Sequence, residues 1–163
     1  MKSIKFNTSY LKIIINNNVS KILNSYKQIR KNINENGGVL MGELYPSSNK
    51  IIITHALVCN NQSSLRHSVN LNTKCLQKKI LKIWKESNGR ITYLGDWHTH
   101  PENKPSPSLT DYKTFVKNYY TSKFDQNILL YVILGKKNTK WVKLFNGILF
   151  CSINLNHQSI LKE

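Results

Sequence analysis

The hydrophobic positions of this chain follow helical spacing in some segments and strand spacing in others. Apolar residues recur at helical intervals over about residues 19–34, from about residue 71 to Asn88-Gly89, and after Ser108, so each of these segments is expected to form a helix. Strand-like runs occupy residues 3–15, 39–45, 51–59, 91–98, 128–134, 140–145 and 148–155. Helices and strands interspersed in this order predict a mixed α/β fold.

Polar and turn-forming residues separate these segments. Asn16, Asn17 and Asn18 are candidate N-caps for the first helix. Residues 60–68 are polar and are expected to form a loop. Asn146-Gly147 is a hairpin signal between the last two strands.

The length of 163 residues suffices for one well-buried core, so a single domain over residues 1–163 is expected. No apolar run approaches the roughly 20 residues that cross a membrane, and the N-terminus lacks the apolar segment of a signal peptide. The three cysteines, Cys59, Cys75 and Cys151, are odd in number and far apart. They are expected to be reduced thiols in a cytoplasmic protein.

The formal net charge is +16, because 24 Lys and Arg residues face 8 Asp and Glu residues. Such a charge is typical of nucleic-acid-binding proteins, but 21 of the cations are lysines and 3 are arginines, and arginine is preferred for bidentate phosphate contacts. Part of the charge reflects a coding bias toward Lys, Asn and Ile. Another part is expected to steer an acidic partner toward the protein by long-range attraction. A nucleic-acid partner is therefore not expected.

The segment from His98 to Asp111 carries the candidate chemistry, in the pattern H-x-H-x7-S-x2-D. A strand places His98 and His100 on the same face, and Asp111 could supply an oxygen ligand from a returning turn. Two nitrogens and one carboxylate, with one open position, are how a catalytic zinc is usually held. Zinc lowers the pKa of a bound water toward roughly 7.

Ser108 and Asp111 also have a structural interpretation. A serine followed three residues later by an acid, ahead of apolar residues at helical spacing, is typical of a helix N-terminus. A helix N-terminus can carry both a cap and a ligand, so the two interpretations are compatible. The cap alone does not explain two histidines at a spacing of two before a proline-rich turn.

The run YLGDWHTHPENKPSPSLTD resembles the JAB/MPN (JAMM) zinc peptidases, and its W-H-T-H-P segment is similar to their small stand-alone bacterial members. Upstream, residues 35–42 resemble the family's E-x-x-G-h-h-x-G segment, and residues 51–58 its next strand. The resemblance covers about residues 17–150. It implies a curved mixed β-sheet flanked by helices, an architecture like that of cytidine deaminases.

The resemblance also implies roles for five residues. His98, His100 and Asp111 would bind one zinc ion per chain, Glu35 would be the general base, and Ser108 would stabilise the oxyanion. Glu43 is an alternative general base, but Glu35 precedes the glycine-rich segment as the family's acid does, whereas Glu43 is expected to face solvent or pair with a lysine. Trp97 is expected to pack beneath the site.

The implied activity is that of a zinc metallopeptidase, a deubiquitinase-like isopeptidase that cuts after the C-terminal glycine of a ubiquitin-like modifier or conjugated protein. Similar bacterial proteins are found beside E1- and E2-like proteins in anti-phage and mobile-element operons, so such partners are expected. Two alternatives stay open at this point, a catalytically inactive scaffold of the same fold and a nucleic-acid-associated protein. His55 is expected to be a structural residue, and no second zinc site is found.

Overall fold

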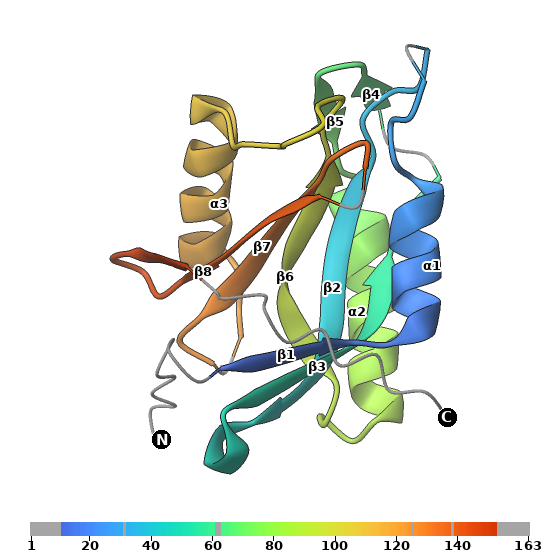
Figure 1. Ribbon diagram of the computed structural model, residues 1–163. Helices are drawn as coiled ribbons and strands as arrows, with labels where there is room; N and C mark the ends of the chain where they lie inside the picture. Colours follow the sequence, from blue (N-terminus) through green and yellow to red (C-terminus); the bar gives the residue numbers. More distant parts are fainter. Residues whose placement is uncertain (1–10, 31, 61–62, 125, 138, 153–163) are drawn as a thin grey trace.

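The computed structural model describes residues 11–30, 32–60, 63–124, 126–137 and 139–152. Its centre is a seven-stranded mixed sheet in the order β1-β3-β2-β6-β7-β8-β9 (Figure 1). The strands are β1 (Lys12–Ile15), β2 (Gly37–Tyr45), β3 (Lys50–Leu57), β6 (Thr92–Thr99), β7 (Leu129–Leu134), β8 (Lys140–Phe145) and β9 (Phe150–Ser152). The pairs β1–β3 and β6–β7 are parallel, and the other neighbours are antiparallel.

Three helices cover the two faces of this sheet, α1 (Asn17–Ser25), α2 (Thr73–Glu86) and α3 (Leu109–Thr121). Neighbouring strand residues point to opposite faces, and β2 shows the result. Leu40 belongs to the core cluster that contains Val19 of α1, whereas Val39 packs with Leu76 of α2. Phe115 of α3 packs against β7. One pocket is lined by both α2 and α3, so these two helices share the face opposite α1.

Strand β6 lies between β2 and β7, at the floor of the groove between α2 and α3. Its neighbour β2 approaches β3 unusually closely. A Cβ atom on Gly38 would lie 1.9 Å from the carbonyl oxygen of Leu57, so only glycine is accommodated there. On its other side, β2 pairs with β6 in a register that places Gly37 opposite His98, so the start of β2 lies beside the histidine-bearing end of β6.

Most of the expected elements are confirmed. The strands at 39–45, 51–59, 91–98, 128–134 and 140–145 each overlap an observed strand, and helices follow Leu71 and Ser108 as expected. The parts of the first and last predicted strands at residues 3–10 and 153–155 lie outside the described residues. Between β2 and β3 lies a short 3-10 helix, η1 (Pro46–Ser48).

Two element predictions are wrong. The first helix ends at Ser25 instead of residue 34. Beyond it, the side chain of Gln28 is fully buried and donates to the carbonyl oxygens of Ile33 and Arg66, contacts that the chain makes by leaving the helix. The expected loop at 60–68 contains a hairpin, β4 (Ser63–Leu65) and β5 (Ser68–Asn70). Its strands are short and polar, so they lack the apolar alternation that marks a strand.

The prediction that all cysteines are reduced is also wrong. Cys59 and Cys75 form a disulfide, with their Cα atoms 6.3 Å apart, and Cys151 is free. The fold brings the residues after β3 against the first turn of α2, a proximity that sequence spacing does not encode. Among the described residues, no helix is long and apolar enough to span a membrane.

Candidate metal centre and active site

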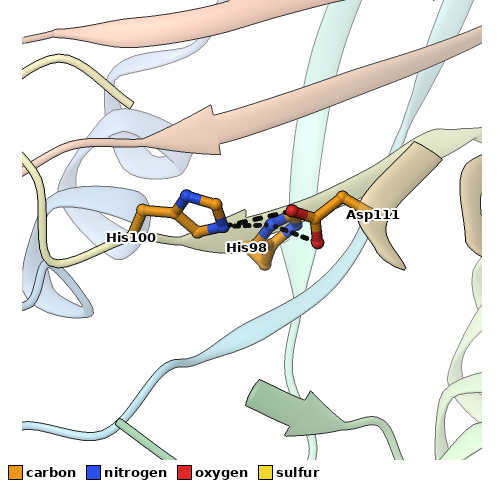
Figure 2. Close-up of side chains that lie close together, drawn as sticks. All are labelled: His98, His100 and Asp111. Carbon is orange, nitrogen blue, oxygen red and sulfur yellow. Dashed lines mark hydrogen bonds and ion pairs between the residues drawn. The ribbon is translucent and has the colours of Figure 1, made fainter. Parts of the chain in front are cut away.

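The last residues of β6 and the turn after it bring two imidazoles together. His98 and His100 are separated by two positions, so both side chains leave the same face of the strand. Their Nε2 atoms lie 3.0 Å apart, and both side chains are buried. Figure 2 shows that the two rings converge on one point from neighbouring positions of the chain.

Asp111 completes this cluster from the first turn of α3. Its Oδ1 atom lies 3.2 Å from Nε2 of His98, and its Oδ2 atom lies 3.4 Å from Nε2 of His100 (Figure 2). Among the described residues, this is the one group of three His, Cys, Asp or Glu side chains whose ligand atoms come close enough to share an ion. The structure therefore brings together the three side chains that the sequence pattern proposed as zinc ligands.

The spacing of these atoms fits a tetrahedral metal ion. Zinc bonds of about 2.0–2.1 Å define a tetrahedron whose corners are about 3.3–3.4 Å apart. The observed separations are 3.0 Å between the two Nε2 atoms, 3.2 Å from His98 to Oδ1 of Asp111 and 3.4 Å from His100 to Oδ2, the other oxygen of the same carboxylate. Two imidazole nitrogens and one carboxylate form the donor set of a catalytic zinc site, with one corner left for a water molecule or a substrate.

Ser108 caps α3 and holds the carboxylate of Asp111. The backbone N–H and the hydroxyl of Ser108 each donate to Oδ2 of Asp111 over 2.7 Å, and the N–H of Asp111 donates to Oγ of Ser108 over 3.1 Å. This capping box confirms the expected helix start. It also orients a candidate ligand, which is the usual task of hydrogen bonds behind a metal site.

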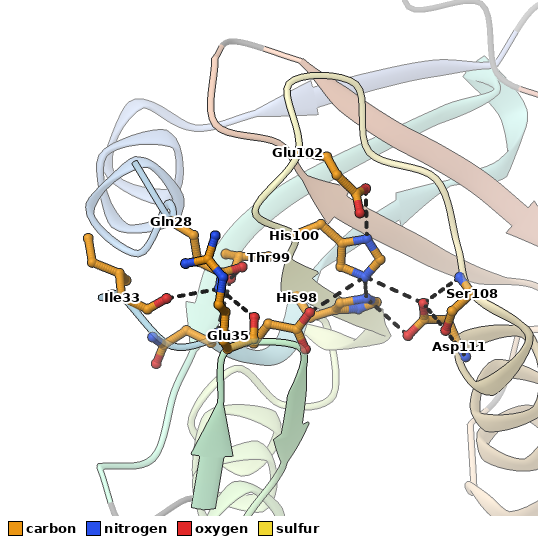
Figure 3. Close-up of polar contacts among 11 residues, drawn as sticks. Gln28, Ile33, Glu35, His98, Thr99, His100, Glu102, Ser108 and Asp111 are labelled. Atoms are coloured by element: carbon orange, nitrogen blue, oxygen red, sulfur yellow. Dashed lines mark hydrogen bonds and ion pairs between the residues drawn. The ribbon is translucent and has the colours of Figure 1, made fainter. Parts of the chain in front are cut away.

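Glu35 lies on the other side of His100, two residues before the start of β2. Its Oε1 atom is 3.8 Å from Nε2 of His100, and the residue is 5% exposed (Figure 3). Burial raises the pKa of its carboxyl to about 7, and His100 opposes that rise while Asp111 and Glu102 add to it. A carboxyl with such a pKa can both accept and donate a proton near neutral pH.

The other charged groups of the cluster support one another. Burial acts to raise the pKa of Asp111, but hydrogen bonds from His100, His98 and Ser108 hold that pKa well below its ordinary value. Burial acts to lower the pKa of His100, yet the carboxylates of Asp111, Glu35 and Glu102 raise it. Three carboxylates around His100 make this a site that attracts a cation.

Glu102 was not singled out by the sequence pattern. Its Oε2 atom lies 3.4 Å from Nδ1 of His100, the ring nitrogen that faces away from the cluster and that has no hydrogen-bond partner among the described residues. A carboxylate that accepts a hydrogen bond from the second nitrogen of a metal-bound histidine fixes its tautomer; Glu102 lies in the place for this role, as an ion-pair partner of the ring. The sequence signal was an acid two residues after His100.

These groups open into one cleft of about 680 Å³. Its walls are the β4–β5 hairpin, the residues before α2 and the start of α3, and its floor is β6. Four acidic residues line it, Glu35, Asp96, Glu102 and Asp111, and no Lys or Arg is among its lining residues. Asp96 is buried and accepts hydrogen bonds from Tyr93 Oη and Asn118 Nδ2.

The remaining candidates lie away from the cluster. The carboxylate of Glu43, in β2, accepts a hydrogen bond from Tyr45 and is not among the residues that line the cleft. Glu43 was expected to face solvent or to pair with a lysine; it is half-buried, and its partner is this tyrosine. His55 contacts Thr54 through Nδ1 over 2.9 Å, which confirms a satisfied structural histidine. Trp97 is 1% exposed and belongs to the core beneath the site, as expected.

Comparison with known proteins identifies relatives of this chain. A profile described as prokaryotic homologs of the JAB domain matches residues 24–145. A protein of Escherichia coli (strain TW11681), named CD-NTase/cGAS isopeptidase, is 34% identical over 140 residues, which is 83% of this chain and 85% of the relative. A protein of the same name from Vibrio cholerae serotype O1 is 29% identical over 150 residues, 85% of this chain and 89% of the relative.

The fold is shared with a solved structure as well. The solution structure of protein DSY2949 from Desulfitobacterium hafniense superposes with a TM-score of 0.59 at 19% identity, covering 91% of this chain and 95% of that one. At this identity the likeness concerns the fold alone.

Proposed function

This chain belongs to the family of prokaryotic JAB-domain homologues, and from that premise we propose that it is a zinc-dependent isopeptidase. The single observation that carries the proposal is the cluster of His98, His100 and Asp111 with Glu35 beside it. An inactive scaffold of the same fold would have no need for a buried acid of raised pKa next to three converging ligand side chains.

His98, His100 and Asp111 would hold the metal. When bound there, zinc would polarise a water molecule and stabilise negative charge on a carbonyl oxygen. The residues of the chain supply the rest of the chemistry. Ser108 orients Asp111 through its hydrogen bonds, and Glu102 lies beside His100 as an ion-pair partner. The burial of both histidines excludes bulk water from their side of the cleft.

Glu35 would act as the general base and then as the general acid. Its carboxylate accepts a proton from the attacking water and returns that proton to the leaving nitrogen when the amide bond breaks. Its position, 3.8 Å from Nε2 of His100, supports this role because the water must lie beside the ligand cluster. The raised pKa of Glu35 matches the need to carry a proton in both directions near pH 7.

Ser108 would stabilise the oxyanion through its hydroxyl. The Oγ atom accepts the N–H of Asp111 whichever way its own proton points, so the hydroxyl can turn from Asp111 to a substrate oxygen without loss of the cap. The residue is exposed at the mouth of the cleft, where a substrate carbonyl would arrive. This arrangement supports an oxyanion donor that needs no movement of the backbone.

The substrate would be a protein conjugate. The relatives are named for isopeptidase action on CD-NTase/cGAS, and we propose the same class of substrate here, an amide bond after the C-terminal residue of a conjugated CD-NTase or a ubiquitin-like modifier. Ser68, Val69 and Asn70 of β5 line the cleft. Because β4 and β5 form a sheet of only two strands, the hairpin offers a strand edge to an extended tail.

The test is hydrolysis of a CD-NTase, or of a ubiquitin-like protein, joined through its C-terminal residue to a lysine amine of a reporter. We expect the wild type to release both proteins and Glu35→Gln to retain zinc and substrate binding but to release none. Glu43→Gln is the matched control, because it makes the same change outside the cleft, and it should remain active. Cleavage by Glu35→Gln, or its loss in Glu43→Gln alone, would contradict the assignment.

A further inference from the structure

Gln28 is a buried polar side chain that the chemistry described so far does not use. It lies between α1 and β2 and is 0% exposed. A buried amide is costly unless its donors and acceptor are paired. Its partners therefore show what the fold gains from it.

Three hydrogen bonds satisfy this amide, and Figure 3 shows Gln28 beside two of the partners, Ile33 and Thr99. Nε2 donates to the carbonyl oxygen of Ile33 over 3.0 Å and to that of Arg66 over 2.9 Å. Oε1 accepts from the hydroxyl of Thr99 over 3.2 Å. Both N–H groups of the amide are used, and the two carbonyl acceptors fix which end of the amide is the nitrogen.

Each partner belongs to a different segment that frames the candidate active site. Ile33 precedes Glu35 by two residues, and Arg66 lies in the turn of the β4–β5 hairpin that walls the cleft. Thr99 stands between the two histidines, with its side chain on the opposite face of the strand. From the face of the sheet opposite the two histidines, Gln28 thus connects three segments that are far apart in the sequence.

Thr99 also makes hydrogen bonds to Asn36, the residue after Glu35. Its hydroxyl accepts the N–H of Asn36 over 3.0 Å, and its own N–H donates to the carbonyl oxygen of Asn36 over 2.9 Å. On the other side, the N–H of Glu35 donates to the carbonyl oxygen of Leu65 over 2.8 Å. The backbone of Glu35 is therefore held at both ends by segments that Gln28 joins.

We propose that Gln28 is a positioning residue for the general base. Glu35 lies outside helices and strands, and its backbone is held by the bond from Glu35 to Leu65 and the bonds between Asn36 and Thr99. Gln28 fixes the segments that provide these partners through its own bonds to Ile33, Arg66 and Thr99, and in this way it sets the distance from Glu35 to His100. The predicted loss of kcat rests on the proposed function, whereas the effect of Gln28 on the backbone around Glu35 does not depend on it.

The test compares Gln28→Met with Gln126→Met. Methionine keeps the length of glutamine and removes the amide. Gln126 is the matched control, because it is 3% exposed and its amide donates to the carbonyl of Tyr93, outside the Gln28–Thr99 network. A displacement of Glu35 by about 1 Å should lower kcat by about 10–100-fold, with KM and zinc content kept. Gln126→Met should lose stability at unchanged kcat.

A second measurement needs no substrate. In Gln28→Met, amide hydrogen exchange in residues 33–37 should quicken relative to wild type, and in Gln126→Met it should not. If the wild type cleaves no conjugate, the proposed function fails while the exchange data still decide the role of Gln28. If Gln28→Met does not fold, Thr99→Val should show the same loss of kcat, and Thr99→Ser, which keeps the hydroxyl, should restore it. An unchanged kcat and unchanged exchange in either loss variant overturn the proposal.

Discussion

At the scale of single residues, one hydroxyl serves two purposes. The Ser108 side chain is both the N-cap of α3 and a donor to the candidate ligand Asp111. The cap was predictable, because a serine and an acid three residues apart are a local signal. The bond to the ligand carboxylate was not, since it depends on how Asp111 turns toward His98 and His100.

Ser108→Ala tests the oxyanion role. Turnover should fall by about 10²–10³-fold, the loss typical of one oxyanion donor, and the free energy of unfolding should fall by about 1 kcal/mol through loss of the cap. Rate and thermal stability are measured together, with Ser106→Ala as the control at another exposed serine. A loss of stability at an unchanged turnover rate would show that Ser108 caps the helix and does not stabilise the oxyanion.

The raised pKa of Glu35 predicts the pH dependence of the rate. A carboxyl acts as a base only when it is ionised, so kcat/KM should increase with pH, about tenfold per unit, below its pKa. That pKa is about 7 without a cation, and a bound cation lowers it, so the rise should level off at or below pH 7. Glu43→Gln should show the same profile, and a rate that falls between pH 5 and pH 7 would contradict Glu35 as the base.

At the scale of elements, the sequence predicted the strands and the histidine-bearing end of β6 because these depend on local spacing. The sequence-based prediction was wrong where contacts between residues far apart in the chain determine where an element ends. Tyr26, Ile29 and Ile33 continue the helical spacing of α1, yet the helix ends at Ser25 and Ile29 is 63% exposed. The burial of Gln28 beneath Thr99, about seventy residues away, outweighs that spacing.

The segment between β3 and α2 is closed by the disulfide of Cys59 and Cys75. The enclosed residues include the hairpin that walls the cleft, and the two cysteines are 16 residues apart. A loop of this size is worth about 3 kcal/mol in the chain-entropy account.

Removal of both thiols tests that contribution. The variant Cys59→Ser, Cys75→Ser should lose about 2–4 kcal/mol of unfolding free energy in oxidising buffer, because its unfolded state is no longer cross-linked. Denaturant unfolding with and without a thiol reductant measures this, and Cys151→Ser, at the free cysteine, is the control. If the reductant leaves the unfolding free energy of the wild type unchanged, the disulfide does not contribute to stability.

At the scale of the whole molecule, charge is segregated. Half of the 8 acidic residues line one cleft in a chain of net charge +16. The cleft is therefore suited to a cation. Neither composition nor net charge alone reveals this separation, because it arises only when β6, α3 and the segment before β2 come together.

The content of zinc in the purified protein tests the central claim most directly. We expect one zinc per chain in the wild type, because three donors and an open corner make a complete catalytic site. The variant His98→Ala, His100→Ala should contain almost none, since one remaining carboxylate cannot hold the ion. Elemental analysis of both proteins, prepared identically, gives the answer, and stoichiometric zinc in the double variant or a wild type that binds no zinc would contradict the account.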